Sequence, residues 1–228
     1  MSKAIILYGP PGSGKGTQAS ILAKEMGLIQ FDIGSLLEKI VHDKVNSKNK
    51  KIAEQREIFD KGGLNDSEWV KEIVTPYIEA IGKSGFGIVL SGSLRTTDET
   101  FGKQNKEGLL DILEKSFGKK NIFFGFLEVS PETSIKRNSH RLICTVCGTP
   151  MQARANLKKC LFCGGKLRKR SLDKPEIIKV RLKTFKDQTE PVIHGLKKRG
   201  YAIYKINGEG EPHEVYERLI KKIDSWQK

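Results

Sequence analysis

A glycine-rich segment directly after the first apolar run limits what this chain can fold into. Residues Gly9–Thr17 read GPPGSGKGT and follow the apolar run Ala4–Tyr8. Glycines between a buried strand and a helix let backbone N–H groups approach phosphates, and a lysine there reaches the terminal phosphates. The alternative is a glycine-rich turn that contains a lysine by chance. The strand before the loop and the helical stretch Thr17–Met26 after it favour a nucleotide-binding loop.

The loop departs from the usual G-x-x-x-x-G-K-[ST] pattern at one position. Gly9, Gly14 and Lys15 match it, but Gly16 stands where a hydroxyl usually serves Mg²⁺. The metal-directed hydroxyl must therefore come from Thr17 or Ser13. The residues predicted to hold a nucleotide's phosphates are Gly12, Ser13, Gly14, Lys15, Gly16 and Thr17.

Short apolar runs alternate with helix-length segments along the rest of the chain. The expected helices include Ser13–Met26, a helix from Ser67 to Ala80 with Ser67 as its N-cap, and a last helix from Pro212 to Trp226. The expected buried parallel strands are Ala4–Tyr8, Leu28–Phe31, Gly87–Leu90, Ile122–Glu128 and Tyr201–Ile206. This alternation predicts an α/β fold: a P-loop, doubly wound, parallel five-stranded sheet.

Two segments interrupt the alternation. Residues 32–85 read as mostly helical, whereas residues 142–170 have little helical pattern and contain every cysteine. We expect both to be excursions at the strand ends, where doubly wound sheets bind ligands. The predicted division is core at 1–31, 86–136 and 172–228, a helical insertion at 32–85, and a small lid at 137–171.

The four cysteines form two copies of C-x-x-C-G. Cys144 and Cys147 make one hook, Cys160 and Cys163 the other, with twelve residues between the hooks. Two such hooks facing each other supply a tetrahedral thiolate set for structural zinc. Surface thiols or a redox pair are the alternatives, and the two matched hooks favour zinc. Because protein fills all four positions, we expect a structural metal.

Composition points to a polar, water-exposed protein. The chain has 228 residues, of which 37% are hydrophobic and 30% charged. We expect no signal peptide and no membrane span, and therefore the cytoplasm. Residues 151–200 hold 15 Lys/Arg against 4 Asp/Glu, most of the net charge of +14. That block suits nucleic-acid binding or a lid that neutralises phosphates. The lid is favoured because several arginines of the block stand at positions that suit a role in catalysis.

Together these motifs resemble the adenylate kinase family, in the class with a zinc-binding lid. The residues that carry the resemblance are Gly9–Ala19, the two cysteine hooks, Gly92–Thr96 in the place of a GFPRT motif, and spaced arginines in and after the lid. The resemblance covers nearly the whole chain, from Ile5 to about Ile223. It implies a helical acceptor-binding insertion, a monomer, and transfer of the γ-phosphoryl group of MgATP to AMP.

The resemblance also implies roles for individual residues. Gly12–Thr17 would cradle the ATP phosphates, and Arg137 and Arg141 would contact ATP. Arg170 and Arg181 would close over both phosphate chains. The alternative for each of these arginines is a solvated charge on the surface. Bidentate arginines suit this task because the substrate phosphate is itself the nucleophile and needs only positioning and cations. The residues expected to act in catalysis are Lys15, Arg95, Arg137, Arg170 and Arg181.

The acceptor side departs from the family pattern. Ile33 replaces a threonine that faces the base, Glu38 replaces an arginine that grips the AMP phosphate, and Glu99 replaces a base-reading glutamine. Basic residues of the insertion could supply the missing cation; they are Lys44, Lys48, Lys50, Lys51 and Arg56. The expected acceptor-binding residues are Ile33, Gly34, Gly63, Leu64, Asn65, Gly92, Arg95, Glu99, Arg170 and Arg181.

Metal handling departs from the pattern as well. Ser35 and Ser91 replace carboxylates that touch Mg²⁺ through water, and a double aspartate in the lid is reduced to Leu172 and Asp173. Asp32 is then either an outer-shell partner of Mg²⁺ or a plain helix N-cap. AMP remains the expected acceptor, with no nucleic acid and no membrane as partners. The alternatives are a kinase for CMP, UMP or GMP, a zinc-ribbon nucleic-acid-binding P-loop ATPase, and a catalytically weakened relative.

Overall fold

A five-stranded parallel sheet forms the centre of the protein, whose computed structural model describes residues 2–152 and 157–227. The strands lie in the order β2-β3-β1-β4-β8, and every neighbouring pair is parallel. Their bounds are β1 (Ala4–Tyr8), β2 (Ile29–Asp32), β3 (Ile88–Ser91), β4 (Ile122–Glu128) and β8 (Ile203–Asn207). The predicted α/β fold with a parallel five-stranded sheet is confirmed.

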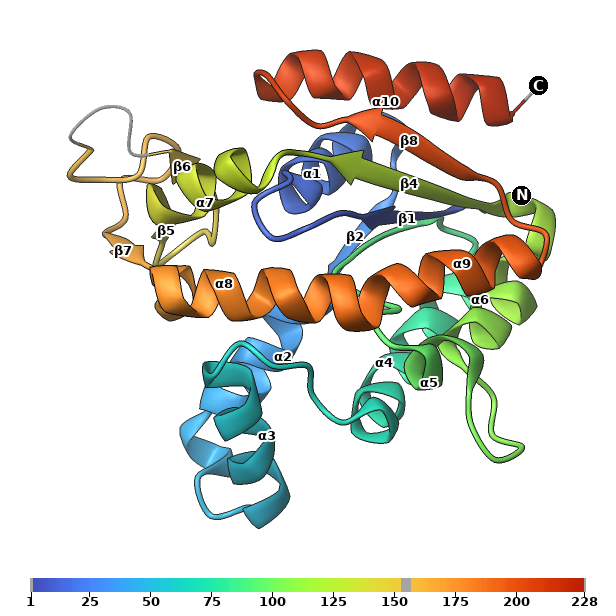
Figure 1. Cartoon of the computed structure of the whole chain (residues 1–228), viewed down its shortest axis with the longest axis horizontal. Coiled ribbons are helices and arrows are strands. Elements are labelled where there is room, and N and C mark those ends of the chain that lie inside the picture. Colours follow the sequence, from blue (N-terminus) through green and yellow to red (C-terminus); the bar gives the residue numbers. More distant parts are fainter. Residues whose placement is uncertain (1, 153–156, 228) are drawn as a thin grey trace.

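Helices cover both faces of the sheet (Figure 1) because alternate residues of a strand point to opposite sides. Ile5 and Leu7 pack against α1 and α10 on one face. Ile6 and Tyr8 pack on the other face with residues of α4, α6 and α9. These helices are α1 (Lys15–Met26), α4 (Ser67–Lys83), α6 (Leu109–Phe117), α9 (Glu190–Lys198) and α10 (Pro212–Trp226).

The two edge strands differ from the prediction. β2 starts at Ile29, one residue later than expected, and its first two residues are exposed. β8 starts at Ile203 rather than Tyr201 and is buried only at Ile206. An edge strand has a neighbour on one side only, so its burial is incomplete. The expectation of burial was therefore wrong for these two strands and holds for β1 and β3, which are buried throughout.

The start of α4 also differs from the prediction. Its N-cap is Asp66 rather than Ser67, because the Asp66 carboxylate accepts the Trp69 N–H at 2.9 Å. Asp66 thereby satisfies a backbone donor that the first helical turn leaves unpaired. The predicted end of α1 at Met26 is confirmed, and the C-cap Gly27 adopts the left-handed conformation with φ of 63°.

Two excursions leave the sheet at the ends of β2 and α7. The first is α2 (Ile33–His42), η1 (Lys44–Asn46) and α3 (Lys50–Asp60), which hang below the sheet in Figure 1 before the chain returns through α4. The second is a small antiparallel sheet in the order β6-β5-β7. Its strands are β5 (Arg141–Cys144), β6 (Pro150–Gln152) and β7 (Leu167–Lys169).

The remaining elements connect these parts. α7 (Pro131–Ser139) leads from β4 to β5, and α8 (Pro175–Thr184) continues through the π-helical turn η4 (Phe185–Thr189) into α9 as one long rod. The short elements are α5 (Thr97–Phe101), η2 (Lys119–Asn121) and η3 (Ser171–Asp173). Within the described residues, no helix combines the length and apolar content needed to cross a bilayer.

Candidate functional site

The loop between β1 and α1 has glycines at positions where a side chain would be strained, and α7 supports it from behind. Gly12 and Gly14 have φ of 83° and 92°, a conformation that favours glycine. A Cβ on Gly12 would lie 2.6 Å from Asn138 Nδ2 and 2.7 Å from the Ser134 carbonyl oxygen. The Ser134 hydroxyl also donates to the Pro11 carbonyl. The loop therefore presents backbone to one side and rests on α7 with the other.

Lys15 lies at the start of α1 and folds back over the loop. Its Nζ donates to the carbonyl oxygens of Gly9 at 2.6 Å and Pro10 at 2.9 Å. It also lies 3.3 Å from Oγ of Ser13, a residue that is only 1% exposed. The side chain of Thr17, two residues on, is partly exposed at the first turn of the helix. The ammonium group is thus fixed beside the amides that would receive phosphate.

Three arginines from distant segments lie near Lys15, namely Arg95 after β3, Arg141 on β5 and Arg181 on α8, and Arg170 after β7 lies near Arg181. Burial, followed by Arg95 and Arg181, lowers the pKa of Lys15 to about 7. Burial and then the three other arginines lower the pKa of Arg181 to about 9. Both shifts report like charges held together out of water. This cation cluster of five side chains is suited to a ligand with several negative charges.

Arg95 enters the cluster between two glycines that the sequence singled out. A Cβ on Gly92 would lie 2.7 Å from Arg95 Nη2, and a Cβ on Gly34 would lie 3.2 Å from it. Gly92 also has φ of 75°, which disfavours any larger residue. The two glycines therefore give the Arg95 guanidinium room at the carboxyl end of β3.

Glu99 shapes the loop that carries Arg95. It is 5% exposed, and its carboxylate accepts the Leu94 N–H at 2.7 Å. Leu94 has φ of 52°, a strained conformation for a branched side chain. Burial raises the pKa of Glu99, while the nearby Arg95 acts in the opposite direction. The carboxylate thus stabilises a strained turn, a function that the sequence did not indicate.

Asp173 is the acidic partner of two arginines of the cation cluster, Arg141 and Arg181. It accepts from Arg141 through Nε at 2.8 Å and Nη2 at 2.5 Å, and lies 3.8 Å from Arg181 Nη1. Its side chain is 4% exposed. The sequence singled out Asp173 only as the remnant of a double aspartate, and no local pattern reveals this pairing.

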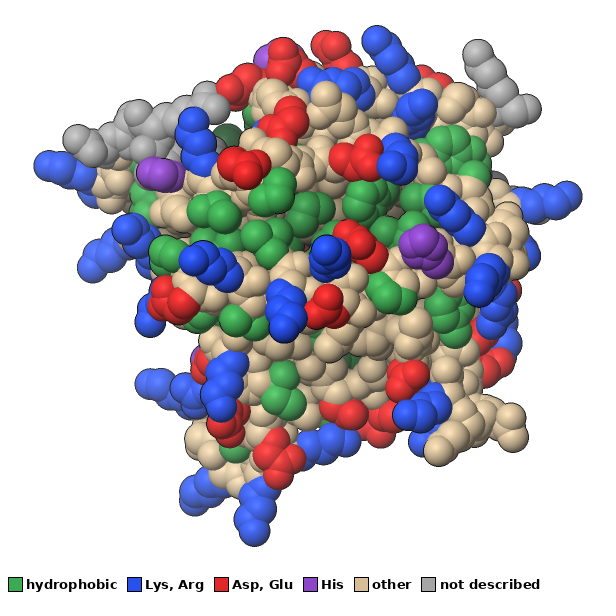
Figure 2. Space-filling model, viewed as in Figure 1, with side chains coloured by type: hydrophobic (Ala, Val, Ile, Leu, Met, Phe, Trp, Pro, Cys, Tyr) green, Lys and Arg blue, Asp and Glu red, His purple; other side chains and the backbone are tan. Residues whose placement is uncertain are grey.

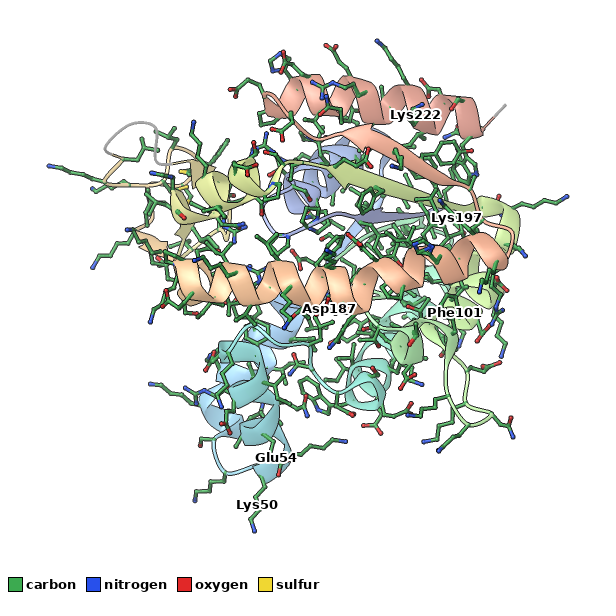
Figure 3. All side chains as sticks on the ribbon, in the orientation of Figure 1. Lys50, Glu54, Phe101, Asp187, Lys197 and Lys222 are labelled. Carbon is green, nitrogen blue, oxygen red and sulfur yellow. The ribbon has the colours of Figure 1, made fainter. Side chains whose placement is uncertain are left out.

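Glu38 is paired with two arginines at the end of β7. Its carboxylate lies 2.5 Å from Arg170 Nη2 and 3.5 Å from Arg168 Nη2. Two of the basic residues that the sequence offers as replacement cations form pairs within or beside the insertion. Lys51 pairs with Glu72, and Arg56 pairs with Asp60. Figure 3 shows Lys50 and Glu54 at the far tip of α3, pointing away from the body of the protein.

Asp32 acts as the N-cap of α2. Its Oδ1 accepts the Ser35 N–H at 3.0 Å. Its other oxygen, Oδ2, lies on the side of the P-loop, 3.9 Å from where a Cβ on Gly16 would be. Asp32 also opposes the lowering of the pKa of Lys15. The capping alternative is therefore confirmed, and it leaves one carboxylate oxygen directed toward the phosphate loop.

Other predicted residues lie apart from the cation cluster. Arg137 donates to the carbonyl oxygens of Gly208 at 2.9 Å and Gly210 at 2.8 Å, so it braces the loop before α10. Ile33 is 1% exposed and belongs to the main hydrophobic core. Asn65 is 8% exposed and donates to Gln55.

The turn before Asn65 lies at the edge of the insertion. A Cβ on Gly63 would lie 3.1 Å from Ile58 Cγ2, so this glycine packs against the end of α3. Leu64 borders a surface pocket that Thr96 and Gln188 also line. The turn therefore sits between the insertion and the long α8–α9 rod.

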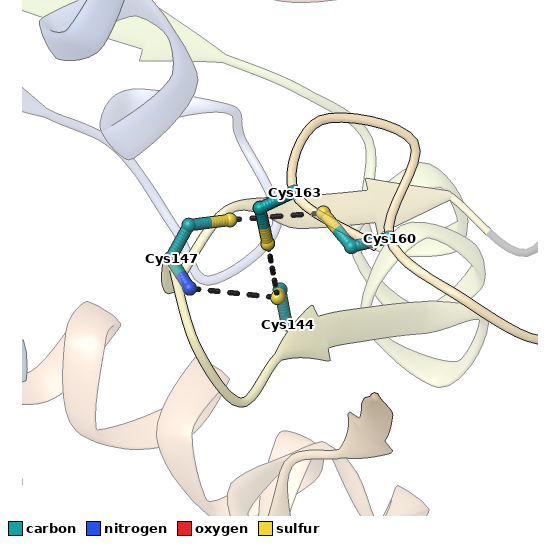
Figure 4. A group of neighbouring side chains, drawn as sticks. All are labelled: Cys144, Cys147, Cys160 and Cys163. Atoms are coloured by element: carbon teal, nitrogen blue, oxygen red, sulfur yellow. Dashed lines mark hydrogen bonds between the residues drawn. The ribbon is translucent and has the colours of Figure 1, made fainter. Parts of the chain in front are cut away.

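The four cysteines converge at one end of the small sheet (Figure 4). All four sulfurs lie within 4.8 Å of one another, with Cys144–Cys163 at 3.4 Å and Cys147–Cys160 at 3.7 Å. A tetrahedral zinc thiolate site with bonds of about 2.3 Å has sulfurs about 3.8 Å apart. The N–H groups of Val146 and Phe162 point at cysteine sulfurs at 3.4 Å, which favours thiolates. The set fits a four-coordinate metal ion.

Charged side chains surround these parts on the face shown in Figure 2. Lys and Arg side chains project around the cysteine end of the molecule at the left and around the tip of α3 at the bottom. Acidic side chains are interspersed among them. The surface therefore carries mixed charge there, while the cation cluster owes its character to arginines that are mostly shielded from solvent.

The chain is similar to adenylate kinases over nearly its full length. Residues 7–201 match the family model described as adenylate kinase. The adenylate kinase of Petrotoga mobilis is 30% identical, covering 98% of this chain and 99% of that protein. Those of Chlamydia pneumoniae and Clostridium kluyveri are 32% and 33% identical, covering 96% and 94% of each chain.

Proposed function

The chain belongs to the adenylate kinase family, and from this premise we propose that it transfers the γ-phosphoryl group of ATP reversibly to AMP, giving two ADP. The observation that carries the proposal is the gathering of Lys15 and four arginines beside the glycine loop. Phosphoryl transfer requires mainly positioning and charge stabilisation, because the acceptor phosphate is itself the nucleophile. A shielded cluster of cations provides both.

On the ATP side, the amides of Gly12–Thr17 would bind the β- and γ-phosphates. Lys15 would exchange its contacts with the loop carbonyls for phosphate oxygens and stabilise the charge on the transferred group. Arg141, whose charge is partly offset by Asp173, would bind the same phosphates. Arg137 would act next to the nucleoside of ATP, since it braces the loop at Gly208.

On the acceptor side, Arg95 would hold the AMP phosphate, with Gly34 and Gly92 leaving room for its guanidinium. Arg170 and Arg181 lie in the same cluster and would bridge the two phosphate chains. Their planar forks suit the equatorial oxygens of a transferring phosphoryl group. The acceptor's base would rest near Ile33, Gly63–Asn65 and Glu99, with Glu99 acting through the loop that it stabilises.

Two metal ions belong to this proposal. Mg²⁺ would be supplied with ATP and would offset the negative charge of its phosphates. The Thr17 hydroxyl would face it, and Oδ2 of Asp32, the oxygen that does not cap α2, would support it through water, in place of the carboxylates absent at Ser35 and Ser91. Zn²⁺ would occupy the four-cysteine set as a structural ion, because protein fills every ligand position.

We also propose the division into parts expected from the sequence. The core would comprise 1–31, 86–136 and 172–228, with an acceptor-binding insertion at 32–85 and a lid at 137–171. Closing a lid over the cation cluster would exclude water that otherwise hydrolyses ATP. We propose a cytoplasmic monomer with no nucleic acid or membrane partner.

Another acceptor base is the second candidate, because Ile33 is apolar, Glu38 is acidic and Glu99 is committed to the loop. The test measures ADP formation from MgATP with AMP, CMP, UMP and GMP, with Lys15→Ala as the control. Preference for AMP, abolished by Lys15→Ala, supports an adenylate kinase. Preference for another monophosphate supports the second candidate. ATP hydrolysis that no monophosphate accelerates contradicts both.

A further inference from the structure

Glu38 and Arg170 join the two excursions of the fold. Glu38 lies on α2 of the insertion, whereas Arg170 directly follows β7 of the cysteine-bearing sheet, 132 residues later. Arg170 Nη2 lies 2.5 Å from Glu38 Oε2, and the two side chains are 14% and 19% exposed. The Coulombic attraction within an ion pair shielded to this degree is stronger than that within an exposed pair. The pair is therefore a specific contact between segments that flank the site.

Arg170 is at the same time a member of the cation cluster. It is the foremost charge among those that lower the pKa of Arg181, and it also lowers the pKa of Arg95. Its Nε is buried and finds no hydrogen-bond acceptor among the described residues. Glu38 thus engages one end of the guanidinium and leaves the Nε donor unsatisfied. A phosphate group, which takes both donors of such a fork, would satisfy it better.

A second contact draws the same segments together. Gly62, in the turn after α3, has φ of 80°, and a Cβ there would lie 2.8 Å from Ile177 Cγ2 and 3.0 Å from Arg181 Cγ. The insertion therefore touches α8 at Gly62 and the end of β7 at Glu38. The Glu38–Arg170 pair therefore forms where the insertion already lies against the side chain of Arg181.

We propose that Glu38 is a built-in competitor for the phosphate group of the acceptor, an inference that rests on the proposed function. Its carboxylate occupies the Arg170 guanidinium, and a nucleoside monophosphate must displace it to bind. A dianionic phosphate attracts the guanidinium more strongly than a single carboxylate does, so the exchange favours ligands with two charges. Glu38 therefore selects the acceptor by its charge and weakens the binding of all phosphates at this position.

The test substitutes Glu38→Gln, which removes the charge and keeps the shape. Calorimetry measures the Kd values of AMP, adenosine and inorganic tripolyphosphate for the wild type and the variant. We expect E38Q to bind AMP and tripolyphosphate about tenfold more tightly, a change of about 1.4 kcal/mol, with adenosine unchanged. KM for AMP should fall, and kcat should stay the same or fall because ADP leaves more slowly.

Glu57→Gln is the matched control. Glu57 lies on the adjacent helix α3 and pairs with Lys61 at 2.5 Å, but both side chains are more than two-thirds exposed. This variant should bind all three ligands as the wild type does. Glu38→Asp, which keeps the charge on a shorter side chain, should give an intermediate gain and serves if E38Q folds poorly.

Weaker binding of AMP by E38Q would overturn the inference, because it would mean that Glu38 holds Arg170 in a productive position. An equal change in the Kd of AMP and of adenosine would overturn it too, because the effect would not depend on the phosphate. Unchanged Kd values in both Glu38 variants would overturn it as well. The tripolyphosphate titration separates this inference from the proposed function. Tighter binding of tripolyphosphate by E38Q without turnover of any monophosphate supports competition at Arg170 and contradicts the kinase.

Discussion

Replacing Asp173 by asparagine removes the carboxylate that pairs with Arg141 and Arg181. Asp173 receives two hydrogen bonds from Arg141, at 2.8 Å and 2.5 Å, and lies 3.8 Å from Arg181. Asparagine has the same size and still accepts one hydrogen bond, so the packing around this 4% exposed side chain is preserved. The variant therefore tests charge rather than volume.

The expected cost follows from this geometry. Breaking a buried ion pair by removing one partner costs about 3–5 kcal/mol, because the other charge stays buried without compensation. Arg141 and Arg181 are 20% and 19% exposed, so water screens them in part, and the retained hydrogen bond reduces the loss further. We expect a loss of about 2–3 kcal/mol in the free energy of unfolding. For a chain of this size that corresponds to about 5–10 °C in Tm.

The assay is differential scanning calorimetry with and without inorganic tripolyphosphate. Tripolyphosphate should raise the Tm of Asp173→Asn more than that of the wild type, since the freed arginines bind it more tightly. Asp98→Asn is the control, because Asp98 forms an exposed pair with Lys103 at 3.3 Å and should change Tm by less than about 2 °C.

A Tm of Asp173→Asn within about 2 °C of the wild type would refute this reasoning. So would an equal gain from tripolyphosphate in both proteins. Either result would mean that solvent, rather than Asp173, compensates the positive charge of Arg141 and Arg181.

Three further predictions test other parts of the site. Cys160→Ser should lower Tm by at least about 5 °C while leaving most of the activity at 25 °C, because the metal stabilises the small sheet locally; a melting curve identical to that of the wild type would contradict a structural metal. Lys15, with its pKa lowered to about 7, is largely neutral at pH 8.5, and bound phosphates should raise that pKa again. Binding of tripolyphosphate at about pH 8.5 should therefore take up close to one proton and should weaken as the pH rises toward 9.5. Calorimetry in buffers of different ionisation enthalpy measures this proton uptake. Lys15→Ala should abolish the uptake. Gly12→Ala should reduce kcat/KM at least tenfold, because its Cβ would lie within 2.7 Å of Asn138 and Ser134 atoms at a φ of 83°. Activity near that of the wild type would contradict this, because it would mean that α7 moves to accommodate the methyl group.

The local patterns in the sequence predicted the parts of the fold that depend on neighbours along the chain. The glycine loop, the strand β1 and the cysteine hooks are each contained in a few consecutive residues. The edge position of β2 was missed because apolar content does not reveal which strands have neighbours on both sides. The cap of α4 was misplaced by one residue because Asp66 and Ser67 are both good N-caps.

The ion pairs of the site could not be predicted from the sequence. Asp173 meets Arg141 across 32 residues, and Glu38 meets Arg170 across 132. Both pairs arise only when the small antiparallel sheet and the insertion come to rest against the core. The family resemblance identified Arg141 and Arg170 as phosphate contacts, and Glu38 and Asp173 as departures from the family motifs. It did not predict which of these side chains pair, because the pairs form only in the tertiary structure.

The most direct test of the central claim follows the phosphorus atoms themselves. Phosphorus NMR of MgATP and AMP incubated with the zinc-loaded protein resolves ATP, ADP, AMP and inorganic phosphate in one sample. We predict that ATP and AMP disappear at equal rates while two ADP appear for each ATP consumed, with no release of phosphate. Loss of ATP accompanied by inorganic phosphate and unchanged AMP would contradict phosphoryl transfer at this site.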